Sequence, residues 1–365
     1  MRKKEKKNKA ALFHIVKRGD HLDWRFALMV RAAAVILAMV VSGLVITLLV
    51  EKNPVEVYMS MFKGAFGTAD RIWWLLQDIA LLLGVSLAVS PAFKMKFWNI
   101  GAEGQVLVGG LATILVMVFL GGTMPGWLLI VVMVVASILA GVIWAVVPAF
   151  FKARWNTNET LFTLMMNYVA IQLVSYFLKA YVRDGSGVLP SMPQYGLPVI
   201  AGKAYLLNIL IVAVLTIGMY IYLKYSKQGY EISVVGESEN TAKYIGIDVK
   251  KVIIRTMMLS GAICGIVGLL IVGGTNHTIN STSAGGRGFT AIMVSWLAKF
   301  NPIVMVFTTF LIVFLQRGAG QISTDFGINA SISDIITGII LFFIIGCEFF
   351  LQYRVIFNKS RKENV

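Results

Sequence analysis

Residues 127–149 read WLLIVVMVVASILAGVIWAVVPA, a run of 23 residues that contains no charged side chain. A helix that crosses about 30 Å of hydrocarbon needs about 20 predominantly apolar residues, so this run predicts a transmembrane helix. Nine further apolar runs occur, at residues 27–50, 72–93, 98–120, 159–178, 205–223, 252–273, 288–300, 302–316 and 332–351. The sequence therefore predicts an all-α polytopic membrane helix bundle of about ten transmembrane helices. The runs 288–300 and 302–316 are expected to be short or broken helices.

The overall composition excludes a soluble protein. Of the 365 residues, 58% are hydrophobic and only 14% are charged, and the mean hydropathy is +0.78. Soluble domains average about 45–50% apolar and about 25% charged residues. A formal net charge of +15 would suggest nucleic-acid binding in a soluble protein, but such proteins reach that charge through many charged groups. We therefore expect a membrane protein that contacts lipid and has no nucleic-acid partner.

The distribution of Lys and Arg predicts the orientation in the membrane. Five segments carry the positive charge: residues 1–31 (+7), 354–365 (+3), 224–255 (+2), Lys94 with Lys96 (+2) and Lys152 with Arg154 (+2). Cytoplasmic loops are enriched in Lys and Arg, and ten helices place all five segments on one side. We therefore expect a multi-pass protein of the bacterial plasma membrane with both termini in the cytoplasm.

The predicted organisation has three parts. A cytoplasmic basic segment (1–26) precedes the transmembrane domain (27–351), and a cytoplasmic basic tail (352–365) follows it. A long inner loop at about 224–251 divides the ten helices into two sets of five. Because five is odd, two structurally similar halves would be inverted relative to one another in the membrane.

Polar side chains interrupt two of the predicted helices. Asn99, Glu103 and Gln105 follow Phe97 closely, and Asn167 lies well inside the run 159–178. Such groups are expensive in contact with acyl chains, so they should face protein or a water-filled cavity. Glu103 either contacts solute or is a structural carboxylate bound to the backbone at a helix N-terminus. Asn167 either lines a pathway or forms an interhelical hydrogen bond.

The inner loop contains a segment suited to docking. Ser238 is a plausible N-cap for a helix of one or two turns, and Gly246 is a plausible stop. Such a short helix is not stable alone in water. It either packs on its own bundle as a connector or is completed by a groove of a cytosolic partner.

Soluble-enzyme chemistry is not evident in the chain. No G-x-x-x-x-G-K-[ST] phosphate loop and no G-x-S-x-G elbow occurs. The three histidines form no pattern of metal ligands, and Cys264 and Cys347 lie in apolar runs where packing explains them. We expect no metal, no bound cofactor and no catalytic residues, and hence a protein that is not itself an enzyme.

Four ordered motifs resemble those of a known family. The stretch WNIGAEGQ (98–105) resembles the N-I-G-x-E-G-Q signature of nucleoside and simple-sugar ABC-importer permeases, in the branched-chain amino acid/ribose-type permease superfamily. Residues 158–168, 235–262 and 286–292 are similar to further segments of that family. Trp98 departs from the usual phenylalanine, and WLAKFNP (296–302) is bulkier than the family's glycine-containing version.

The resemblance implies a transport mechanism. A solute would be delivered by an extracellular binding lipoprotein to a pair of permease subunits, this chain and a related but distinct one. A cytosolic ABC ATPase, which holds ATP and Mg²⁺, would drive alternating access. The resemblance assigns these residues to the ATPase-coupling segment: Gly236, Glu237, Asn240, Thr241, Ala242 and Gly246. The best pathway and substrate candidates are Asn99, Glu103, Gln105 and Asn167.

Two other classes of function remain open at this point. An ion-coupled secondary transporter of a small polar solute could use Glu103 or Asp78 to bind its proton or sodium ion. A channel or structural subunit would need no ATPase. The motifs and the inner loop favour the ATP-driven importer.

Overall fold

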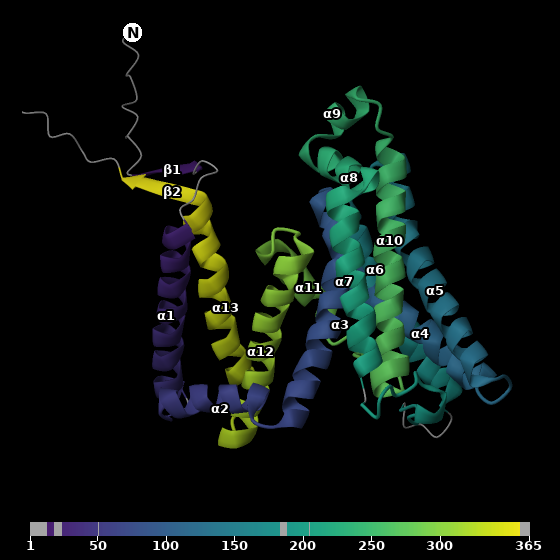
Figure 1. Cartoon of the computed structure of the whole chain (residues 1–365), viewed down its shortest axis with the longest axis horizontal. Coiled ribbons are helices and arrows are strands. Elements are labelled where there is room, and N and C mark those ends of the chain that lie inside the picture. The colour runs from purple at the N-terminus through teal and green to yellow at the C-terminus, as the bar shows by residue number, and fades with distance from the viewer. Residues whose placement is uncertain (1–12, 18–23, 50, 183–187, 204, 358–365) are drawn as a thin grey trace, which may run out of the picture. The chain divides into compact units, whose positions relative to one another are not determined.

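The computed structural model describes residues 13–17, 24–49, 51–182, 188–203 and 205–357. These residues form two compact units. Unit 1 contains the described residues up to Gly67 and from Leu315 onward, and unit 2 comprises Thr68–Phe314. The elements of both units are labelled in Figure 1.

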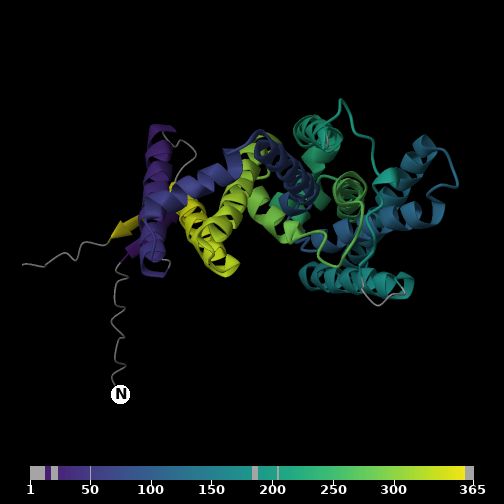
Figure 2. The same ribbon diagram turned by 90° about the horizontal axis from the view of Figure 1, so that it is seen from below.

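Unit 2 is a bundle of helices (Figure 1). Its elements are α3 (Ala69–Lys94), α4 (Ala102–Leu120), α5 (Gly126–Trp155), α6 (Glu159–Tyr181), α7 (Leu206–Tyr225), α8 (Lys227–Glu237), α9 (Glu239–Tyr244), α10 (Val249–Ile271), α11 (Arg287–Leu297) and the first part of α12 (Pro302–Phe326). A 3₁₀ turn (Pro193–Tyr195) and a π-helical turn (Val272–Asn276) complete it. The central helix is α10, which packs against α3, α4 and α5; Figure 2 shows α10 nearly end-on.

Glycines bring α5 and α10 into close contact. A Cβ added to Gly265 would overlap the Ser137 carbonyl oxygen, and one added to Gly261 would overlap the Gly141 carbonyl oxygen. Side chains of any size would therefore push the two backbones apart, as in other membrane helix pairs built on small residues. These glycines in the middle of α10 therefore serve helix packing.

We expect Gly265→Ala to destabilise the permease by about 1–3 kcal/mol, the usual cost of overpacking a core. Gly218→Ala is a matched control, because a Cβ at Gly218 on α7 would meet no atom within 4 Å. That control should be neutral or stabilising, since alanine favours helix more than glycine does. Thermal unfolding in detergent measures both. Equal unfolding temperatures for the two variants would contradict the close-packing assignment.

Unit 1 joins the two ends of the chain. It contains α1 (Trp24–Leu49), α2 (Pro54–Phe66), the second part of α12 and α13 (Ala330–Gln352), with α1 packed against α13. Strand β1 (Phe13–Lys17) pairs antiparallel with β2 (Tyr353–Phe357). This two-stranded sheet was not expected from the sequence. It places β1 and β2 beside one another at one end of the α1–α13 pair (Figure 1).

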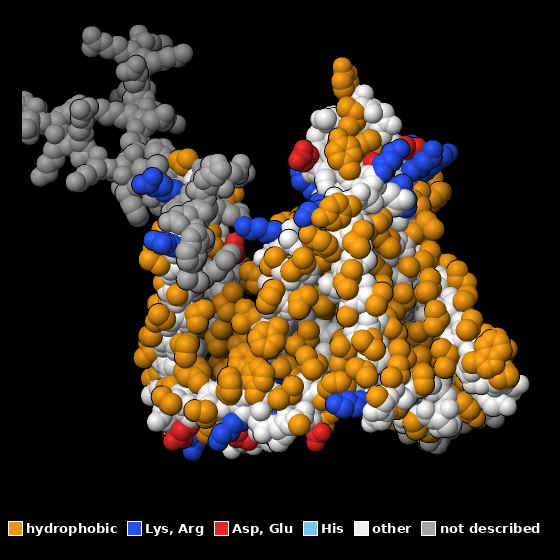
Figure 3. Space-filling model, viewed as in Figure 1, with side chains coloured by type: hydrophobic (Ala, Val, Ile, Leu, Met, Phe, Trp, Pro, Cys, Tyr) orange, Lys and Arg blue, Asp and Glu red, His pale blue; other side chains and the backbone are white. Residues whose placement is uncertain are grey.

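Eight helices of the described residues are long and apolar enough to cross a membrane, namely α3 to α7, α10, α12 and α13. Each of the ten predicted runs coincides with a helix, but α11 has only 11 residues and is about 16 Å long. The count of about ten spans and the inverted halves remain predictions. Figure 3 shows the hydrophobic side chains that cover the helices of unit 2.

One expectation about helix length is wrong. The run 302–316 was expected to be a short helix, yet α12 continues to Phe326. Its polar end is accommodated inside unit 1: the Ser60 hydroxyl donates to the Asp325 carboxylate over 2.6 Å, and α2 packs closely at Gly64 against Gln321. The apolar pattern stops before the helix does, because these polar groups find partners in protein.

Candidate functional site

The four predicted pathway residues come together around the start of α4. Asn99, Glu103, Gln105 and Asn167 are all buried. The Asn99 Oδ1 atom accepts from the Gln105 Nε2 atom at 3.2 Å, and the Asn99 Nδ2 atom donates to the Ser260 Oγ atom on α10 at 3.1 Å. The Oε1 atom of Gln105 has no hydrogen-bond partner among the described residues. Asn99 thus fixes the turn before α4 to α10, and Gln105 keeps one unused acceptor.

Asn167 connects α6 to the same turn. Its Oδ1 atom accepts from the Gly104 N–H at 2.8 Å, and its Nδ2 atom donates to the Ile100 carbonyl oxygen at 2.9 Å. A Cβ at Gly104 would lie 2.9 Å from the same Oδ1 atom, so a larger residue would displace the amide. These contacts are the interhelical hydrogen bonds that were one of the two alternatives for Asn167.

Glu103 binds the N-terminus of the half-length helix α11. Its Oε1 atom accepts from the Gly286 N–H and its Oε2 atom from the Gly288 N–H, each at 2.7 Å. A Cβ at Gly288 would overlap the Glu103 backbone nitrogen. The first N–H groups of a helix lack intrahelical acceptors and carry partial positive charge. The contacts support the structural alternative for Glu103, in which a carboxylate on α4 caps the N-terminus of a different helix, α11.

An ion pair holds the same helix to α3. The Arg287 Nη2 atom lies 3.4 Å from the Asp78 Oδ1 atom, and both side chains are partly buried. Together with Glu103, Asp78 ties the first turn of α11 to two neighbouring helices. The sequence singled out Asp78 as a charge within a predicted helix but did not indicate that it meets Arg287.

Two aromatic departures from the family pattern touch one another. The Trp98 and Trp296 rings are stacked, with centroids 5.6 Å apart and an interplanar angle of 25°. Phe93 packs edge-on against both, and Phe300 packs edge-on against Trp296. The tryptophans are 44% and 49% exposed. They form an aromatic surface made by the end of α11 and the turn before α4.

The predicted coupling segment forms two short helices, α8 and α9. Ser238 caps α9 by accepting from the Thr241 N–H at 3.3 Å, and Gly246 has φ +84° just after it. Both features confirm the expected start and stop of the helix. Among the predicted coupling residues, Gly236 and Ala242 are buried, whereas the exposed ones are Glu237, Asn240, Thr241 and Gly246.

Gly236 anchors the coupling segment to the bundle. A Cβ there would overlap the Lys94 carbonyl oxygen at the end of α3. At the other end of the segment, Asp248 caps α10, and the Lys251 backbone N–H bound to it lowers the pKa of that carboxyl. Sequence reasoning missed Tyr244, which is 92% exposed on α9. An aromatic side chain just before a glycine stop was the available signal.

The far end of α10 carries a second buried polar cluster, also missed. In the π-helical turn, the Thr275 hydroxyl accepts from the Gln77 and Asn208 side-chain amides at 2.8 and 3.2 Å. Just beyond it, the Thr278 hydroxyl donates to the Leu189 carbonyl oxygen at 2.7 Å, so the 188–203 segment packs on this turn. Burial lowers the pKa of the neighbouring His277.

Comparison with known proteins identifies the family. A family model described as "Branched-chain amino acid transport system / permease component" matches residues 72–345. The glucose ABC transporter permease protein TsgB13 of Haloferax volcanii is 28% identical over 345 residues, 90% of each chain. The guanosine ABC transporter permease protein NupP of Bacillus subtilis is 28% identical over 338 residues, 90% of this chain and 94% of that protein.

The nucleoside ABC transporter permease protein NupB of Lactococcus lactis is also similar, with 28% identity over 316 residues, 83% of this chain and 86% of that protein. These relatives are transport subunits and not enzymes. The family model spans most of the chain and includes the start of α4, α8, α9 and α11. The chain therefore belongs to the family of branched-chain amino acid transport system permease components, and it is a permease subunit of an ABC importer.

Proposed function

We propose that this permease imports nucleosides or related purine compounds, with simple sugars as the competing solute class. Two of the relatives named above are called guanosine and nucleoside permeases, and one is called a glucose permease. The observation that carries the proposal is the exposed stack of Trp98 on Trp296. A nucleobase gains about 1–3 kcal/mol by stacking on an aromatic side chain.

The four buried polar residues have an indirect role in this proposal. Asn99, Glu103 and Asn167 hold α4, α6, α10 and α11 together beside the pathway. The buried Oε1 atom of Gln105 has no hydrogen-bond partner among the described residues. Gln105 is therefore the residue of this group best placed to hydrogen-bond a solute when the transporter adopts another conformation.

The partners follow from the same proposal. A cytosolic ATPase that carries ATP and Mg²⁺ grips α8 and α9, and an extracellular lipoprotein delivers the solute at the far end of α10. The second permease subunit is a related but distinct chain. Two different Bacillus subtilis permeases, NupP and NupQ, are each similar to this chain, at 28% and 25% identity, which supports such a pair.

The proposed orientation places α8 and α9 in the cytoplasm of a bacterial cell. Lys and Arg side chains gather beside these helices (Figure 3), as expected for the cytoplasmic side. Strands β1 and β2 lie side by side in unit 1, and the basic residues of the sequence around them support a cytoplasmic location for these strands as well.

The test is uptake by vesicles that contain the complete transporter, with ATP inside and an ionophore to dissipate ion gradients. We expect labelled guanosine uptake to require ATP and to survive the ionophore. Uptake that stops with the gradient and ignores ATP would instead indicate a secondary transporter.

The same vesicles distinguish the solute classes. Excess unlabelled nucleoside should suppress uptake, whereas excess glucose should not. Changing both stacked tryptophans, Trp98→Leu with Trp296→Leu, should weaken the nucleoside preference. Trp155→Leu is the matched control, since Trp155 is exposed on α5 but outside the stack. Suppression by glucose alone would contradict the nucleoside assignment.

A further inference from the structure

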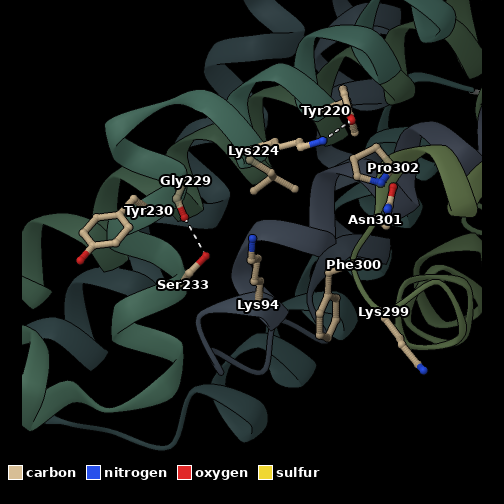
Figure 4. Close-up of a pocket in the computed structure, with 11 residues that line it drawn as sticks. Lys94, Tyr220, Lys224, Gly229, Tyr230, Ser233, Lys299, Phe300, Asn301 and Pro302 are labelled. Carbon is tan, nitrogen blue, oxygen red and sulfur yellow. Dashed lines mark hydrogen bonds between the residues drawn. The ribbon is translucent and has the colours of Figure 1, made fainter. Parts of the chain in front are cut away.

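A basic pocket of about 450 Å³ lies where the ends of four elements of unit 2 meet. Its walls come from the last residue of α3, the end of α7, the first turns of α8 and the connection between α11 and α12 (Figure 4). Three lysines line it, Lys94, Lys224 and Lys299, together with polar groups such as Ser233 and Asn301. No carboxylate is among the lining residues, so the pocket has a surplus of positive charge.

Lys94 provides the central charge of this pocket. Its ammonium group points into the cavity, whereas the side chain of Lys299 is directed away from it (Figure 4). Among the described residues, Lys94 has no hydrogen-bond or ion-pair partner, although it is only partly exposed. The Lys224 ammonium lies on another wall and donates to the Tyr220 hydroxyl at 2.9 Å. A partly buried ammonium without a counter-charge is satisfied by an anion.

The surroundings of the pocket are amphipathic. On α7, the exposed Ile217 and Ile221 precede Lys224 by seven and three residues, so they share its helix face. On α12, the exposed Ile303 and Phe307 lie one and five residues after the pocket residue Pro302, four residues apart on one helix face. A free phosphate ion would use the lysines but would leave these apolar faces without a role. A molecule with an anionic head and hydrocarbon chains uses both.

We propose that this pocket binds the phosphate group of an anionic phospholipid, with the acyl chains along the exposed apolar faces of α7 and α12. Basic pockets between membrane helices on the cytoplasmic side are a recurrent form of lipid recognition. The bound headgroup would connect α8, which leads to the coupling helix, with the connection that follows α11. That connection contains two successive left-handed residues, Lys299 (φ 50°) and Phe300 (φ 59°).

The test measures which lipids stay bound to the delipidated full-length permease in detergent, by native mass spectrometry. Phosphatidylglycerol and phosphatidylcholine are added in equal amounts. Wild-type protein should retain phosphatidylglycerol preferentially. The double variant Lys94→Gln with Lys224→Gln should bind phosphatidylglycerol roughly thirtyfold more weakly, as expected for the loss of two lysine contacts near a membrane surface.

The controls separate this site from general electrostatics and from misfolding. Lys96→Gln with Arg154→Gln removes the same charge from exposed positions outside the pocket and should leave retention unchanged. Lys94→Arg with Lys224→Arg keeps the charge and should restore retention if the glutamine variant folds poorly. Equal retention of both lipids by the wild type, or an equal loss in the control, would overturn the proposal. Displacement of the lipid by millimolar inorganic phosphate would overturn the lipid assignment in favour of a free phosphate.

Discussion

Glu103→Gln is expected to reduce uptake by an order of magnitude or more and to destabilise the permease by about 2 kcal/mol. Each carboxylate oxygen of Glu103 accepts one backbone N–H of the α11 N-terminus. A glutamine keeps one acceptor and turns an NH₂ group toward the other N–H. An unsatisfied buried donor costs about 1–3 kcal/mol, and 1.4 kcal/mol is a factor of ten in an equilibrium. Vesicle uptake and thermal unfolding in detergent measure the two effects.

Asp70→Asn is the control for this substitution. Asp70 is an exposed acid in the first turn of α3, so its neutralisation should change neither measurement. The two readouts also separate a cap from a solute ligand. A cap predicts a lower unfolding temperature without any solute present. An altered KM with an unchanged unfolding temperature would show that Glu103 contacts the solute and that its bonds to α11 contribute little.

The positions of the membrane helices could be predicted because each depends on local composition alone. The predicted run 27–50 overlaps α1, and the run 332–351 overlaps α13 within two residues at each end. The amphipathic α2 was missed because it has 13 residues and carries Glu56 and Lys63, which excludes it from a search for spans. The β1–β2 sheet was missed because its register joins opposite ends of the chain, such as Phe13 and Phe357.

The candidate site shows the same limit at the level of side chains. An acid within an apolar run indicates a buried partner, so Glu103 could be selected from the sequence. Its partners lie 183 and 185 residues away along the chain, and they are backbone groups that no residue type reveals. The Trp98–Trp296 stack is similar: each tryptophan was visible as a departure from the family pattern, but only the fold places them in contact.

Replacing residues 239–244 by a Gly/Ser linker of equal length is expected to abolish assembly with the ATPase. Helix α9 contains an exposed tyrosine, Tyr244, and a buried alanine, Ala242. The alanine side of α9 therefore packs against the protein, and the tyrosine is available to a partner. Truncating an aromatic anchor at a protein interface costs about 2 kcal/mol or more, so Tyr244→Ala alone should weaken ATPase binding by roughly thirtyfold. Removing the whole helix should leave no measurable complex. Co-purification of the ATPase with the permease measures both variants.

The contact at Gly236 determines the residue at which the Gly/Ser linker should begin. Because a side chain there would collide with the Lys94 carbonyl oxygen, a linker that begins at residue 236 would disturb the bundle as well as the docking surface. A linker that begins at residue 239 leaves that contact intact, so a loss of ATPase with an unchanged unfolding temperature can be assigned to docking. Tyr176→Ala, at a tyrosine that is 73% exposed on α6, is the matched control and should retain the ATPase. If the linker variant also retains it, the ATPase must grip another surface, and the coupling role of α9 would be wrong.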